Sequence, residues 1–88
     1  MYIHLGQDTV IKEKDIVGIF DLESTTISKN TRIFLAKAEK RKEVVNVSYE
    51  LPKSFTLVSD SKTKEKKVYI SQISSSTLYK RSGFIDTL

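Results

Sequence analysis

MYIHLGQDTVIKEKDIVGIFDLE, the stretch from residue 1 to residue 23, decides the fold of this chain. Strand-forming residues begin almost at the first peptide bond and lead to a turn at Gly6-Gln7-Asp8. A second apolar run ends at Ile11, a charged corner occupies residues 12–15, and a third run ends at Phe20. Short apolar runs separated by turn residues predict a compact β-meander.

The clearest helix of the chain is expected over residues 31–42. Its apolar positions recur at the spacing of one helix face: Ile27, Thr31, Phe34, Leu35 and Ala38. Three cations, at 40–42, lie in the last turn, where the helix dipole favours positive charge. The pattern predicts an amphipathic helix that lies on a sheet.

The second half of the chain repeats the strand pattern. Strands are expected at 44–49, 55–58 and 68–70, with an exposed hairpin loop over 60–67. Ser74-Ser75-Ser76 reads as a turn and N-cap before a short helix that Gly83 ends, and 84–88 is apolar enough to dock. The sequence therefore predicts one α+β domain over 1–88, a small, mostly antiparallel sheet with one amphipathic helix and a short C-terminal helix.

Length and composition restrict the class of protein. With 88 residues, 39% of them apolar, and no cysteine, the chain has a small core and no disulfide to support it. Small domains of this kind often self-associate, so a homo-oligomer is expected. No apolar stretch reaches the ~18–20 residues of a membrane span, and no signal sequence follows Met1. These features predict a soluble, cytoplasmic protein without a membrane partner.

The charge is unevenly distributed along the chain. Residues 1–23 hold two lysines against five carboxylates, a net charge of −3. Because the whole chain has a net charge of +4, the remaining 65 residues carry +7. Most of the positive charge lies in 29–42 and 61–67. A segregated basic surface indicates a polyanionic partner, although an ordinary solvated surface is also consistent with it.

No residue pattern supports catalysis. His4 is the single imidazole and lies in an expected strand, where solvent exposure or a backbone hydrogen bond explains it. The N-terminal carboxylates fall at corners and strand ends, which suits turn residues. Nucleophile, metal and phosphate-loop motifs are absent from the sequence. The chain is therefore expected not to be an enzyme, and to need no cofactor, metal or small-molecule substrate.

Several short motifs together resemble a known family. They are the Leu5-Gly6 turn, the strand at 15–19, the helix at 31–41, the strand at 44–49 and the closing Ser75-Ser76-Thr77-Leu78-Tyr79-Lys80-Arg81. In this order they resemble the extracellular matrix regulatory proteins of spore-forming bacteria, the RemA/RemB family. The resemblance is closer to the RemB branch, whose members open with Met-Tyr-Ile-His-Leu-Gly as this chain does.

The resemblance implies a DNA-binding transcriptional regulator that promotes biofilm extracellular matrix gene expression. It also implies an oligomer, in some members a ring, that contacts double-stranded DNA through a basic outer surface. RemA-type chains carry arginines at the positions of Asp15 and Leu51-Pro52, and this chain does not. Binding would then depend on cations beside those corners and in the hairpin loop: Lys12, Lys14, Lys53, Lys62 and Lys64. The alternative is an oligomeric protein-interaction scaffold that does not itself bind DNA.

Overall fold

The computed structural model describes residues 2–23 and 28–82 and confirms an α+β fold. Its elements are β1 (Tyr2–Gly6), β2 (Thr9–Lys12), the 3-10 turn η1 (Glu13–Asp15), β3 (Ile16–Asp21), α1 (Lys29–Lys40), β4 (Val44–Asn46), β5 (Ser54–Ser59), β6 (Lys66–Ser71) and α2 (Ser75–Ser82). Ile27 of the predicted helix face, the stop at Gly83 and the apolar tail at 84–88 lie outside the described residues.

The six strands form two sheets, so the predicted meander is wrong in its third strand. β1 and β2 pair as an antiparallel hairpin, whereas β3 joins a four-stranded sheet of order β3-β5-β6-β4. The charged corner is the 3-10 turn η1, closed by the Ile16 N–H that donates to the Glu13 carbonyl, and it directs the chain out of the first sheet. β4 is shorter than predicted and runs parallel to β6, while the other pairs are antiparallel.

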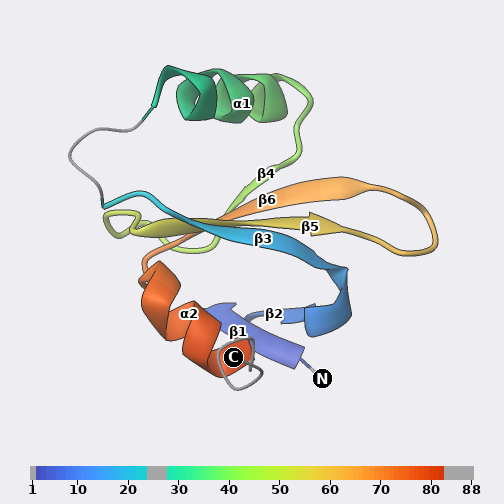
Figure 1. The fold of residues 1–88 in the computed structure, drawn as a ribbon, viewed down its shortest axis with the longest axis vertical. Coiled ribbons are helices and arrows are strands. Elements are labelled where there is room, and N and C mark those ends of the chain that lie inside the picture. The colour runs from blue at the N-terminus through green and yellow to red at the C-terminus, as the bar shows by residue number, and fades with distance from the viewer. Residues whose placement is uncertain (1, 24–27, 83–88) are drawn as a thin grey trace.

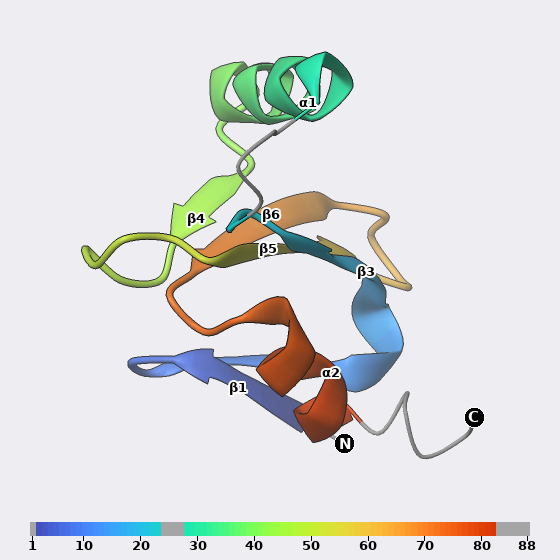
Figure 2. The same ribbon diagram turned by 60° about the vertical axis from the view of Figure 1, so that its left-hand side comes forward.

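One face of the four-stranded sheet, here the hairpin-covered face, lies against β1, β2 and α2 (Figures 1 and 2). Ile3, Leu5 and Leu78 are almost completely buried between the layers. They pack with the buried sheet residues Ile19 and Val58 in one apolar cluster. The alternation of inward and outward side chains in β1 and β2 explains this layer, because every second residue faces the sheet.

Hydroxyl groups join the same layers. The Ser71 hydroxyl donates to the Leu5 carbonyl at 2.7 Å, and the Ser54 hydroxyl donates to the Ile73 carbonyl at 2.7 Å. The Tyr79 hydroxyl of α2 donates to the Ile19 carbonyl at 3.0 Å. These bonds satisfy polar groups that would otherwise be buried at a cost.

The opposite face of the sheet, here the helix-covered face, lies under α1 (Figure 1). Ser28 caps the helix, since its hydroxyl accepts from the Thr31 N–H at 3.1 Å. Ala38 is buried with the sheet residues Phe55 and Val68, and the Phe55 ring stacks between two further rings, those of Phe20 and Phe34. The predicted amphipathic helix on a sheet is thus confirmed, with bounds two residues earlier than expected.

Candidate nucleic-acid interface

The structure brings four of the five predicted lysines to one end of the molecule. Ile16 pairs with Val58, and Ser59 pairs with Lys66, so η1 and the β5–β6 loop lie at the same end of the sheet. We call this the hairpin end and define it as residues 12–15, 41–43 and 60–67. It contains Lys12, Lys14, Lys62 and Lys64.

The β5–β6 loop is held in shape by Asp60. The Asp60 carboxylate accepts hydrogen bonds from the backbone N–H groups of Lys62, at 2.8 Å, and Thr63, at 2.9 Å. The Thr63 N–H and then the Lys62 N–H lower the pKa of Asp60, because both bonds favour the charged carboxylate. The loop therefore presents Lys62 and Lys64 from a hydrogen-bonded turn, and both side chains are exposed.

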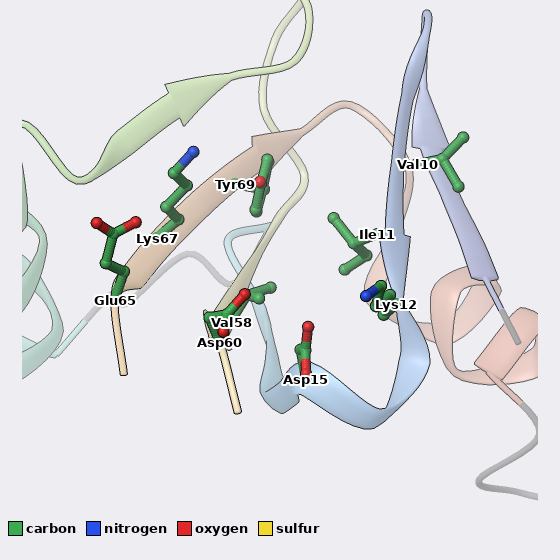
Figure 3. Close-up of a pocket in the computed structure, with 9 residues that line it drawn as sticks. All are labelled: Val10, Ile11, Lys12, Asp15, Val58, Asp60, Glu65, Lys67 and Tyr69. Carbon is green, nitrogen blue, oxygen red and sulfur yellow. The ribbon is translucent and has the colours of Figure 1, made fainter. Parts of the chain in front are cut away.

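Lys12 lies in a different environment from Lys14, Lys62 and Lys64, one that it shares with Lys67. It lines a groove of about 210 Å³ between β2, η1 and the start of β6 (Figure 3). Three carboxylates line the same groove, those of Asp15, Asp60 and Glu65, and Lys12 adds a smaller lowering effect on the pKa of Asp60. One carboxylate oxygen of Asp15 is buried there without a hydrogen-bond partner among the described residues. Both corner lysines are exposed, but Lys14 in η1 does not line this groove, so it is the better placed of the two to contact a polyanion.

Lys53 lies at the opposite end of the sheet. Ser54 next to it pairs with Asp21 and with Ser71, at the far ends of β3 and β6. The Lys53 ammonium is 4.0 Å from the Glu23 carboxylate, the one ion pair within residues 2–23 and 28–82. Near it the β4–β5 loop exposes apolar side chains, with Tyr49 at 106% and Leu51 at 82% of full exposure. Lys53 is thus separated from the four other predicted contacts.

Four further cations at the hairpin end were not predicted as contacts: Arg41, Lys42, Lys66 and Lys67. With Lys64 they line a cleft of about 390 Å³ between the end of α1 and the start of β6. The Val68 N–H donates to the Glu43 carbonyl at 2.8 Å and fixes these two segments side by side. The sequence showed two basic segments, but only the parallel β4–β6 pairing shows that they meet.

His4 and Ser74, two of the residues considered for catalysis, form local hydrogen bonds. His4 is exposed in β1, and its Nε2 hydrogen-bonds the Gln7 carbonyl. The Ser74 hydroxyl accepts from the Thr77 N–H at 3.3 Å, which confirms the predicted N-cap of α2. Within the described ranges, no three His, Asp or Glu side chains gather as a metal site. None of the helices described is long and apolar enough to cross a membrane.

Comparison of the sequence with known proteins identifies the family of this chain. Residues 2–81 match the RemA-like family, described as extracellular matrix regulatory protein A-like. The chain is also similar to the extracellular matrix regulatory protein B of Bacillus subtilis (strain 168), with 42% identity over 85 residues. That alignment covers 97% of this chain and 94% of the relative.

Proposed function

Because the chain belongs to the RemA-like family of extracellular matrix regulatory proteins, we propose that it regulates matrix gene expression by binding double-stranded DNA. Cations of the hairpin end contact backbone phosphates, and several copies of the chain act together in a homo-oligomer. The mechanism involves no catalysis, and the protein acts in the cytoplasm.

The observation that supports this proposal is the concentration of charge at the hairpin end. Its residues include eight cations against five carboxylates. Lys14, Lys62 and Lys64 are exposed, and none of them forms an ion pair with another described residue. Unpaired lysines on an exposed turn suit phosphates, because each contact releases condensed counterions from DNA. The hairpin end has a single arginine, Arg41, so it suits recognition of charge and shape more than bidentate reading of base edges.

Oligomerisation would multiply a weak contact. One subunit presents only a few cations, and linked copies bind the same duplex at a high effective concentration. The end of the sheet opposite the hairpin end exposes Tyr49 and Leu51 in the β4–β5 loop, and exposed apolar side chains of one loop favour association between proteins. DNA contact and self-association would thus use opposite ends of the sheet.

The test is a duplex-binding titration at two salt concentrations with matched charge reversals. Lys14→Glu combined with Lys62→Glu is expected to weaken binding at least about tenfold and to lower the salt slope by about two units. Lys53→Glu is the control at the other end and should have a much smaller effect. If the double variant binds duplex as the parent does, the exposed turns that carry Lys14 and Lys62 are not the DNA surface.

The alternative is an oligomeric scaffold that binds proteins and not DNA. The carboxylates around Lys12 and the Glu23 partner of Lys53 reduce positive charge at two of the predicted contacts. Light scattering with and without duplex distinguishes the two functions. An oligomer whose mass does not change on addition of DNA supports the scaffold, and an increase by the mass of bound duplex supports the regulator.

A further inference from the structure

The cleft between α1 and β6 combines positive charge with an unusual backbone conformation at two of its lysines. It is lined by Arg41, Lys42, Lys64, Lys66 and Lys67, with carboxylates at Glu43 and Glu65. We call it the α1–β6 cleft. Its five cations are all exposed, and they come from the end of the helix, the loop and the strand. Two of them have an unusual backbone conformation.

Lys42 lies at the position after a helix where glycine is the usual residue. Its φ is 59°, in the left-handed region. The Lys42 N–H donates to the Glu39 carbonyl at 3.0 Å, and the Glu43 N–H donates to the Ala38 carbonyl at 3.0 Å. This is the Schellman motif, which glycine closes without steric cost because it lacks a Cβ. The chain has a lysine there instead.

Lys64 has the same left-handed backbone conformation in the β5–β6 loop. Its φ is 64°, and its N–H donates to the Asp60 carbonyl at 2.9 Å. Among the described residues, three that are not glycine have positive φ, and the third is Gln7 with a φ of 47°. Two of these three are therefore lysines, and both line the same cleft. Left-handed residues other than glycine persist where the side chain or the surrounding structure gives a reason to keep them.

We infer that the α1–β6 cleft is a phosphate-binding site, in which Lys42 and Lys64 are retained at glycine-favouring positions for their ammonium groups. Five cations against two carboxylates give the lining an excess of positive charge. Arg41 supplies a planar fork that suits two phosphate oxygens, and the lysines supply point charges around it. The phosphate belongs either to the DNA backbone or to a free phosphorylated ligand. The cleft lies within the hairpin end, so the first source rests on the proposed DNA binding, whereas the second does not depend on it.

The decisive variant replaces both lysines by glycine, Lys42→Gly with Lys64→Gly. Glycine accepts the left-handed backbone, so the melting temperature should be equal to that of the parent or higher. Binding of inorganic tripolyphosphate should nevertheless fall at least about tenfold, because charge-assisted hydrogen bonds are lost. Gln7→Gly is the matched control: it makes the same backbone change in the β1–β2 turn and should leave binding unchanged.

Tripolyphosphate and duplex DNA, followed through the backbone amide signals of 41–43 and 64–68, identify the source of the phosphate. Shifts with tripolyphosphate that duplex reverses assign the cleft to the DNA backbone. Shifts with tripolyphosphate that duplex leaves unchanged assign it to a free phosphorylated ligand. If tripolyphosphate produces no shift, or binds the double glycine variant as tightly as the parent, the inference is wrong. Failure of the Lys14 and Lys62 reversals would refute the proposed DNA surface alone, since neither residue lines the cleft.

Discussion

The two faces of the four-stranded sheet are covered in different ways. On the hairpin-covered face, Leu5 and Leu78 have no exposed surface, and β1, β2 and α2 together enclose the cluster (Figure 1). On the helix-covered face α1 is the only cover within residues 2–23 and 28–82, Ala38 is its one buried residue, and Phe34 remains 38% exposed. A groove of about 230 Å³ lies open between α1 and the sheet, lined by Phe20, Phe34 and Phe55 among others.

The two faces also differ in the side-chain hydrogen bonds that fix the covering elements to the sheet. Side-chain hydrogen bonds from Ser54, Ser71 and Tyr79 cross the hairpin-covered face, whereas no side-chain hydrogen bond between described residues joins α1 to the sheet. Apolar contact is tolerant of small shifts, and buried hydrogen bonds are not. The hairpin-covered face should therefore account for most of the stability, and α1 should adjust its position more easily.

Truncation of one leucine on each face should give the largest contrast. Leu78→Ala removes a fully buried side chain from the hairpin-covered face and should lower the free energy of unfolding by about 3 kcal/mol. Leu35→Ala on α1 removes a half-buried side chain and should cost about 1 kcal/mol. Urea denaturation of both variants measures the difference. Equal losses would contradict the proposed division between the faces.

Removal of the Ser71 hydroxyl should have the next largest effect. That hydroxyl donates to the Leu5 carbonyl and accepts from the Ile73 N–H at 3.0 Å, so Ser71→Ala leaves both groups without this partner. The expected loss is about 1–3 kcal/mol, measured by thermal denaturation. Ser59→Ala is the control, because the Ser59 hydroxyl makes no hydrogen bond to a described residue and should change stability little. Similar losses in both would show that Ser71 acts only through packing.

Thr56→Val should stabilise the protein. Thr56 is completely buried on the hairpin-covered face, and its hydroxyl oxygen has no hydrogen-bond partner among the described residues. Replacing the hydroxyl with a methyl group removes an unsatisfied polar atom and should add about 1 kcal/mol to the free energy of unfolding. Thr56→Ser, which keeps the hydroxyl and loses the methyl group, should destabilise instead. A loss of stability in the valine variant would reveal an unrecognised partner of the hydroxyl.

The smallest expected effect is a loss of hydrogen-bonded structure in the β5–β6 loop at low pH. This loop lies at the end of the sheet and belongs to neither face. The pKa of Asp60 is lowered in the folded state, first by the Thr63 N–H and then by the Lys62 N–H. Its contribution is therefore present above the ordinary carboxyl pKa and is lost as pH falls below about 4. The protection factors of the Lys62 and Thr63 amides, which correct for the slower intrinsic exchange in acid, should fall as pH falls, while those of the strands facing α2 should not. Asp60→Asn removes the titrating group, and persistence of the acid effect there would assign it elsewhere.

Local features of the fold were predictable from the sequence. Apolar spacing located α1, and the serine cluster before the last helix indicated the cap that Ser74 provides. The partner of β3 was not predictable, because alternation within a strand does not encode which strand it pairs with. Ile16 pairs with Val58, far along the chain, and not with the neighbouring β2.

The sequence indicated which segments of the candidate site are basic, but not how those segments are arranged in space. Lysine-rich segments indicated the hairpin end, but their pattern did not show that Lys53 lies at the other end beside Glu23. The position of Lys12 in a groove that three carboxylates also line depends on how η1 meets the start of β6, which is a tertiary feature. Left-handed lysines give no sequence signal at all, because glycine or asparagine is the residue that normally marks such positions.

The strand order β3-β5-β6-β4 has a consequence for synthesis on the ribosome. Both edge strands of this sheet precede the central pair in the chain, and the two segments that pair with them, β5 and β6, emerge last. The nascent chain can close the β1–β2 hairpin early, since its partners are adjacent, but β3 and β4 must wait for the β5–β6 hairpin. At a synthesis rate of roughly 5–20 residues per second, this delay lasts for seconds, during which apolar strand edges stay unpaired. Pairing of the larger sheet is therefore expected to wait for the synthesis of β6, whereas the β1–β2 hairpin can close before it.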